Sequence, residues 1–393
     1  MAVNYAHLPE IQVWNKKMEV MTSISPEVYE YFQYVRNYRT FGTFTFQLNK
    51  NSKKAEFLLD PDAFALVYHD GVEARAGIIE STECNEDAGG ASDEMLIVSG
   101  RTGGMFSERL AVARTATGNG YDIYTGSSES AMRYFVDSNC INALDAAGNP
   151  AHVRAVPNLH LSQTDLQRGA LVTYSARYET VAEILETIAY AGDIGWEVKF
   201  DREERKFIFT VLVGADHTEH SASPVVFRMS RNNISAIEYL NSIQGSKTFA
   251  YTGGLGLETS RQILGVHISD EEPAGFNRRE VFVDASHTDV PSELLTSGMS
   301  ELQRCIGELS LSVEQNPAYT SQQYQLDYNL GDFVTVVYEG IASADLRIIQ
   351  TVDEIIGGGR GDIRKITFSL GTEQPDIRRI VSRTTQKTIE QLK

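Results

Sequence analysis

Alternation of apolar and polar residues dominates the first hundred residues of the chain. Residues 43–48 (Thr-Phe-Thr-Phe-Gln-Leu) alternate strictly, which is the period of a half-buried β-strand. Similar short runs occur at 9–24, 76–79 and 95–100. Several short strands in succession are typical of a small antiparallel barrel. The pattern therefore predicts that residues 1–115 form a first, tube-like β-barrel region.

The middle of the chain, residues 116–222, has mixed periodicity and predicts an inserted α/β domain. Apolar residues share one helical face over 128–144. Two alternating runs, 196–200 and 207–213, flank a charged segment and predict a β-hairpin.

A second helix of this domain is predicted to begin at Thr180. Thr180 and Glu183 have the spacing of a capping box, in which each residue satisfies a free backbone donor at the helix start. An apolar stripe follows, and Gly192 supplies a stop.

Alternation returns after residue 222 and predicts a second β-barrel region in two parts, 223–290 and 317–375. Between these parts a helix is predicted over about 291–313, because apolar residues step by four and three positions in turn. The stripe consists of Leu295, Met299, Leu302, Ile306, Leu309 and Val313. It covers fewer than three heptads, so region 291–316 is expected to be a helix packed on its own domain rather than an intersubunit coiled coil.

A chain of 393 residues is too long for one compact core. The regions above predict a β-rich α+β protein with two tube-like antiparallel β-barrel domains and inserted α/β domains. Residues 376–393 follow these domains and carry five basic residues against two acidic ones. They predict a basic C-terminal helix or tail.

The charge of the chain argues against a protein that grips nucleic acid. The net charge is −18, from 35 basic and 53 acidic residues, whereas phosphate binding needs clustered Lys and Arg. Two interpretations stay open. The acidic surface serves solubility alone, or it lines a channel through which DNA passes without sticking, if the protein forms a ring.

The three cysteines, Cys84, Cys140 and Cys305, are far apart and odd in number. They favour folding in a reducing cytosol over a disulfide framework. The start of the chain has no secretory pattern, and no stretch approaches the ~18 apolar residues of a membrane helix. No membrane anchor is therefore expected.

The search for catalytic or metal-binding residues in the sequence is negative. His217 and His220 lie three residues apart beside Asp216, but they lack the His-Glu-x-x-His spacing of a zinc protease and fall in a predicted loop. Neither a nucleophile elbow nor a Walker loop occurs. Glu203 and Glu204 are adjacent and fit a charged hairpin tip better than an acid–base pair. We predict no catalytic residue, no metal site and no cofactor.

Three segments carry a resemblance to a known family. The first, 196–218, is a predicted hairpin that ends in a Gly-x-Asp-x-Thr pattern at Gly214. The second is Arg-Arg-Glu-Val-Phe-Val-Asp-Ala at 278–285, and the third is Leu-Gly-Asp before a valine-rich strand at 330–336. In this order and spacing they resemble the hub proteins of bacteriophage tail tips and baseplates. That family includes siphophage tail-tip proteins, which can carry a C-terminal lysin, and the baseplate hubs of contractile tails.

The resemblance implies an assembly in the virion. It implies a homotrimer whose two barrels per subunit form a ring that continues the tail tube. The implied partners are the distal tail or tail tube protein, the tape measure protein, and a tail fibre, spike or lysin component, with DNA passing through unbound. The implied location is the tail tip or baseplate, after assembly in the cytoplasm of the bacterial host.

Charged residues of the matching segments and of the basic end are candidate subunit or partner contacts. They are Arg278, Arg279, Glu280, Asp284, Asp332, Arg378, Arg379 and Arg383. Gly331 is expected to permit a tight turn in which Asp332 accepts backbone N–H groups. Our hypothesis is that residues 376–393 contact the next tail component, so that their deletion leaves a folded trimer but impairs attachment.

Long family members append an enzymatic or fibre-binding domain, and this sequence stops at Lys393, so lysin activity is not carried over. Two alternatives stay open. A cell-wall or glycan-binding module would bind glycan without turnover, and a carbohydrate-active enzyme would lose activity on single carboxylate changes.

Overall fold

The structure is a computed structural model. It describes residues 8–371 apart from 85–94, 115–119, 163, 244, 306–307, 317–318, 320, 341 and 358–362. No helix within these residues has the length and apolar character needed to cross a membrane. Arg378, Arg379 and Arg383, with the rest of 376–393, lie outside the described residues.

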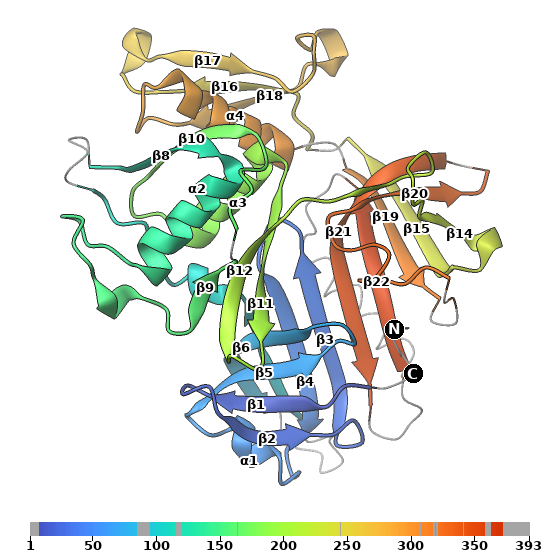
Figure 1. The fold of residues 1–393 in the computed structure, drawn as a ribbon. Coiled ribbons are helices and arrows are strands. Elements are labelled where there is room, and N and C mark those ends of the chain that lie inside the picture. The colour runs from blue at the N-terminus through green and yellow to red at the C-terminus, as the bar shows by residue number, and fades with distance from the viewer. Residues whose placement is uncertain are drawn as a thin grey trace.

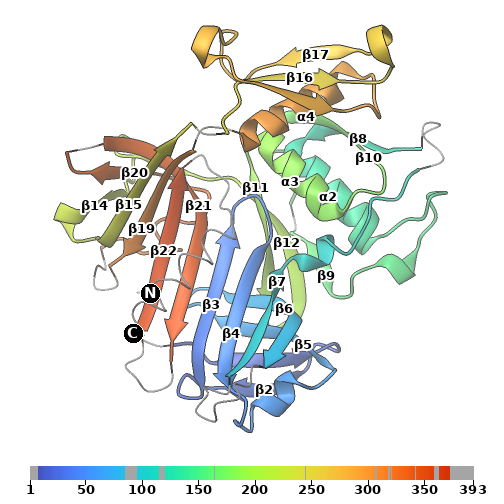
Figure 2. The same ribbon diagram turned by 180° about the vertical axis from the view of Figure 1, so that it is seen from behind.

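One large, curled sheet forms most of the molecule (Figures 1 and 2). Its main path runs β15-β19-β22-β21-β3-β4-β7-β6-β5-β1-β2, and β20 joins β13 and β14 to β21. The N-terminal strands are β1 (Ile11–Asn15), β2 (Val20–Ile24), β3 (Tyr29–Asn37), β4 (Gly42–Asn49), β5 (Ala63–His69), β6 (Ala74–Cys84) and β7 (Met95–Thr102), with a short helix α1 (Ala55–Leu58) between β4 and β5. The C-terminal strands are β13 (Asp216–His217), β14 (Val226–Arg228), β15 (Ile234–Ser242), β19 (Glu308–Gln315), β20 (Phe333–Tyr338), β21 (Ala342–Ile356) and β22 (Ile363–Gly371).

The N-terminal and C-terminal β-regions are joined by the antiparallel pair β3–β21. The pairing runs from Asn37 opposite Gln350 to Tyr31 opposite Ile356. Separate hydrophobic cores lie under the two regions, one centred on the aromatic residues of β3 and β4 and one on β20, β21 and β22. The expected β-rich α+β class with two β-regions is confirmed, and the pairing of β3 with β21 makes them one sheet.

The first inserted domain shares the largest hydrophobic core of the described residues with strands β1, β5 and β6 of the main sheet. It comprises β8 (Asp122–Ser127), α2 (Ser128–Val136), a π-helical turn (Asp137–Ile141), β9 (Leu159–Leu161), β10 (Leu171–Ala176), α3 (Val181–Gly192), β11 (Gly195–Asp201) and β12 (Lys206–Leu212). Helices α2 and α3 pack together, β8 pairs with β10, and β11, β12 and β9 form a three-stranded sheet. The predicted helices and the hairpin of residues 196–213 are confirmed.

The predicted capping box at the start of α3 is present. The backbone N–H of Glu183 donates to Thr180 Oγ1 at 3.2 Å, and that of Thr180 donates to Glu183 Oε2 at 3.0 Å. Helix α3 ends at Gly192, and Asp193 follows it in a left-handed conformation with φ of 51°. The predicted stop at Gly192 is therefore confirmed, with Asp193 rather than the glycine in the left-handed position.

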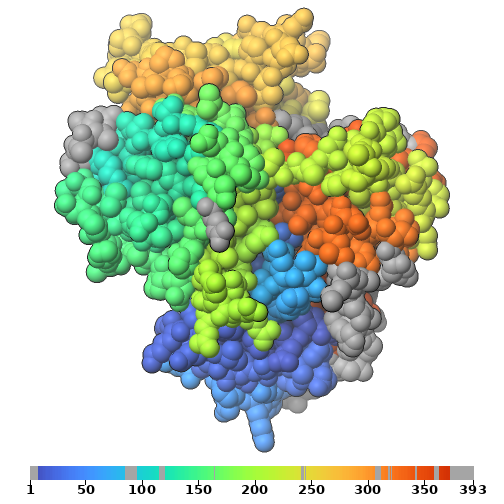
Figure 3. Space-filling model, viewed as in Figure 1, coloured from blue at the N-terminus to red at the C-terminus, as the bar shows by residue number. Residues whose placement is uncertain are grey.

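A second inserted domain lies at the top of Figure 1 and projects from the surface in Figure 3. It consists of β16 (Phe249–Gly253), β17 (Ile263–Val266), β18 (Glu280–Asp284) and helix α4 (Pro291–Arg304). The strands form a separate sheet in the order β17-β16-β18, and α4 packs between this sheet and α3. Residues 249–284, which were assigned to the second β-region, thus have a sheet of their own.

The helix predicted over 291–313 is wrong in its second half. Helix α4 ends at Arg304, and 308–315 is strand β19. Apolar residues at 309, 311 and 313 fit the two-residue period of a strand as well as they fit the helical stripe. The strand prevails because β19 pairs with β15 and β22 on both sides, and Leu311 and Val313 are buried in the C-terminal core.

Candidate functional site

A buried cluster of charged residues lies where the first inserted domain meets the main sheet. Glu197 of β11 places Oε2 2.7 Å from Arg36 Nη2 of β3 and 3.4 Å from Arg75 Nη1 of β6. Arg75 Nε also contacts Asp70 Oδ2 at 2.6 Å. We call these four residues the charged junction.

The charged junction also holds the segment that leads into β20. Arg36 Nη1 donates to the hydroxyl of Tyr324 and, at 3.1 Å, to Asn329 Oδ1. Gln325 Nε2 donates to Asp70 Oδ2 at 2.8 Å. Residues that are far apart in the sequence therefore share one hydrogen-bonded network.

The carboxylates of the charged junction stay ionised. Burial alone would raise the pKa of Glu197, but the guanidinium groups of Arg36 and Arg75 outweigh it and lower that pKa to about 2. Burial opposes ionisation of Asp70 as well, and Arg75 together with backbone N–H groups holds its pKa well below the usual range. The charges are thus paired, as deeply buried charges must be.

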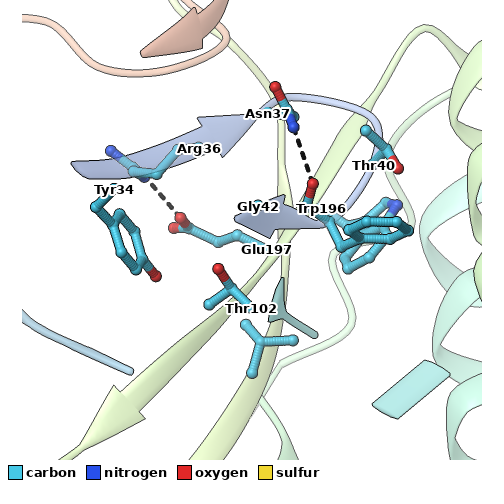
Figure 4. Close-up of a pocket in the computed structure, with 10 residues that line it drawn as sticks. Tyr34, Arg36, Asn37, Thr40, Gly42, Thr102, Trp196 and Glu197 are labelled. Carbon is cyan, nitrogen blue, oxygen red and sulfur yellow. Dashed lines mark hydrogen bonds and ion pairs between the residues drawn. The ribbon is translucent and has the colours of Figure 1, made fainter. Parts of the chain in front are cut away.

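The space beside the charged junction is too small for a substrate. Figure 4 shows Arg36 directed at Glu197. The adjoining cavity, lined by these two residues together with Thr102 and Trp196, has a volume of about 20 Å³. A cavity of that size holds about one water molecule. The junction therefore fixes how the domains meet and offers no reaction chamber.

The predicted turn at Gly331 and Asp332 is present. Asp332 Oδ1 accepts the backbone N–H of Ala215 at 2.8 Å, and Oδ2 accepts that of Asn329 at 2.7 Å. Gly331 has φ of 96° and packs against the ring of Tyr38. Asp332 is only 8% exposed, so its carboxylate ties β13 to this turn and has little surface to offer another subunit.

The other described candidates gather on the second inserted domain, away from Asp332. Arg278 lies over the ring of Phe249, 3.7 Å from its centroid, and forms ion pairs with Glu272 at 2.5 Å and Glu280 at 2.6 Å. Asp284 pairs with Arg261 at 2.5 Å. These charges already have intramolecular partners on an exposed face.

Arg279 differs from its neighbour Arg278 because its side chain bonds to the segment that precedes β16. Its Nη1 donates to Ser246 Oγ at 2.7 Å and to the backbone carbonyl of Ile243. The structure thus brings Arg278, Glu280 and Asp284 onto one face and uses Arg279 internally. A contact role for any of them stays a prediction.

A model of the family described as Siphovirus ReqiPepy6 Gp37-like protein matches residues 10–371. The chain belongs to this family. The resemblance to phage tail proteins stated above is thereby confirmed over most of the chain. A search of curated protein sequences found no match.

Solved structures of prophage tail proteins share the fold of this family member. The 43 kDa tail protein of prophage MuSo2 from Shewanella oneidensis is similar with a TM-score of 0.54 and 12% identity, over 92% of this chain and 98% of that one. A tail protein from Neisseria meningitidis MC58 gives 0.53 and 13%, over 92% and 95%. Prophage tail protein gp18 from Listeria monocytogenes EGD-e gives 0.52 and 10%, over 96% and 98%. At these identities the likeness establishes the fold.

Sequence reasoning missed the charged junction entirely. Glu197 lies in the alternating strand β11, where a charged residue normally faces solvent, and no strand was predicted over Arg36 or Arg75. Their partners are far away in sequence, because Arg36 and Glu197 are 161 positions apart. No signal in the sequence indicates which of these charges meet.

Proposed function

We propose that this chain is the structural hub of a phage tail tip or baseplate. In this proposal three copies form a ring that continues the tail tube, docks the tail-tip components and lets DNA pass. The observation that carries it is the family match over residues 10–371. The fold similarity also extends over 98% of two prophage tail proteins. A structural rather than catalytic role is part of the proposal.

The free edges of the main sheet support a ring. Within the described residues, β15 and β2 stand at the two ends of the strand order, and each pairs on one side only. An unpaired edge is a template for pairing with another chain. Two different edges on one subunit suit a head-to-tail contact, which closes into a ring when the rotation per subunit allows it.

The charge of the chain supports passage of DNA without binding. Fifty-three acidic residues against 35 basic ones give a surface that repels phosphate. An acidic ring lumen would keep the DNA backbone from adhering to the wall. The proposal therefore includes DNA passage and excludes a specific nucleic-acid site.

The proposed partners are those of a tail hub. They are two further copies of this chain, the distal tail or tail tube protein, the tape measure protein, and a fibre, spike or lysin component. The exposed face with Arg278, Glu280 and Asp284 is one proposed contact surface, and the basic segment 376–393 is another.

The first test is the mass of the purified protein in solution, measured by light scattering behind size exclusion. The proposal expects about three times the chain mass of 43.6 kDa at high protein concentration. A monomer at every concentration, also in the presence of the tail tube protein, would contradict the ring.

A further inference from the structure

Helix α4 presents two chemically different faces to its two neighbours. Leu302 and Met299 pack on Ala250 and Val266 of the second inserted sheet. The face toward β10 and α3 is polar, and its residues recur at helical spacing: Glu293, Ser297, Ser300, Glu301 and Arg304. The two inserted domains therefore meet across a polar seam, along α4 in Figure 2.

This seam contains a cavity of about 310 Å³. Residues of β10, α3, α4 and β18 line it. Its lining has four carboxylates, against the guanidinium of Arg304 and the imidazole of His287. The carboxylates are those of Glu179, Asp284, Glu293 and Glu301. Asp284 already pairs with Arg261, and Arg304 Nη2 lies 3.6 Å from Glu186, so the other three lining carboxylates share a guanidinium that also faces a carboxylate outside the lining.

Two buried oxygens in the wall lack a hydrogen-bond partner among the described residues. Glu293 is 4% exposed; its Oε1 accepts the hydroxyl of Ser175 at 2.6 Å, and its Oε2 has no partner. Ser300 is 3% exposed, and its Oγ has no partner either. A buried carboxylate without a cation is costly, and an unsatisfied hydroxyl adds to that cost. Both oxygens would be satisfied by a group that carries positive charge and N–H donors.

We propose that this cavity binds a small organic ammonium ion, such as an aliphatic diamine, whose N–H groups donate to Glu293 Oε2. A diamine fits better than a metal ion, because no group of three His, Cys, Asp or Glu side chains among the described residues is placed to hold a metal. Val283 gives the aliphatic chain an apolar contact in the wall. This site goes beyond the proposed hub function and does not depend on it.

The test is calorimetric titration of the full-length protein with 1,4-diaminobutane. We expect binding by the native protein and about tenfold or more weaker binding by Glu293→Gln, since a hydrogen-bonded charge pair is lost. Glu203→Gln is the matched control. It removes the same charge from an exposed hairpin turn and should leave the affinity unchanged.

Further arms of the titration separate the alternatives. Ser297→Leu places an apolar side chain into the cavity and should abolish binding. This variant tests the site independently if Glu293→Gln fails to fold. The neutral analogue 1,4-butanediol and magnesium chloride should not bind. Absence of diamine binding to the native protein, equal loss in Glu203→Gln, or equal binding of butanediol or magnesium would overturn the proposal.

Discussion

At the residue scale, the paired charges of Glu197, Arg36 and Arg75 hold the first inserted domain against the main sheet. The capping box of Thr180 and Glu183 and the turn at Gly331 and Asp332 were predicted because their partners are near in sequence or are backbone groups. The charged junction was not predicted, because most of the first inserted domain separates Glu197 from Arg36 in the sequence. No local pattern encodes that meeting.

Replacement of Glu197 by Gln is expected to destabilise the protein by about 3–5 kcal/mol, because Arg36 and Arg75 then stay buried without their shared carboxylate. Chemical unfolding monitored by circular dichroism measures the change. Glu203→Gln, at the exposed hairpin turn, is the control and should stay within about 0.5 kcal/mol of the native protein. Equal effects of the two substitutions would show that the junction does not stabilise the fold.

Acid is expected to weaken the fold through the same junction. The pKa of Glu197 is lowered to about 2, whereas an unfolded glutamate titrates near about 4.3. Its contribution to the free energy of unfolding is therefore fully present above pH ~4.3 and is lost as the pH falls toward 2. Thermal unfolding at a series of pH values tests this. Glu197→Gln should show a shallower decline below pH ~4.5, and an unchanged decline would refute the assignment.

Gly331→Ala is expected to be more destabilising than Gly340→Ala. Both glycines have positive φ, 96° and 79°, so both substitutions strain the backbone by about 1 kcal/mol. A Cβ at residue 331 would also lie 2.4 Å from the ring of Tyr38, whereas nothing lies within 4 Å at residue 340. The added clash should cost about 1–3 kcal/mol in chemical unfolding. Equal losses would mean that the Tyr38 contact is not tight.

At the element scale, type and position were largely predictable, and partners were not. The hairpin of β11 and β12 and strand β4 follow from alternation that each segment carries by itself, whereas β3 and β5 were not predicted. Residues 308–315 fit both a helical and a strand period, and only the ladders to β15 and β22 decide for the strand. The sequence pattern places residues 249–284 in the second β-region. The sequence of a strand does not specify which other strand it pairs with.

We expect the free edge of β2 to be a contact between subunits. Val20 is 49% exposed on that strand, and lysine is a residue that blocks pairing at sheet edges. Val20→Lys should leave the fold intact and weaken trimer formation, as seen by light scattering at matched concentration. Val153→Lys is the control, because Val153 is 96% exposed in the first inserted domain and far from the sheet edge. If both variants assemble like the native protein, this edge is not a subunit contact.

At the scale of the whole molecule, the sequence predicted the succession of β-rich, α/β and β-rich regions. It did not predict that β3 and β21 pair and make one curled sheet, because those strands are about three hundred residues apart in the chain. It also did not predict that α4 joins the two inserted domains through a polar seam with a cavity. Both features arise from contacts between complete domains.

We propose that three copies of this chain form a ring at the end of the tail tube. The most direct test is cryo-electron microscopy of tails from the phage that encodes it. We expect three subunits around the tube axis, with the curled sheets facing the channel. Strands β2 and β15 of neighbouring subunits should lie at the interfaces. Density for this chain outside the tube axis, or as a single copy, would contradict it.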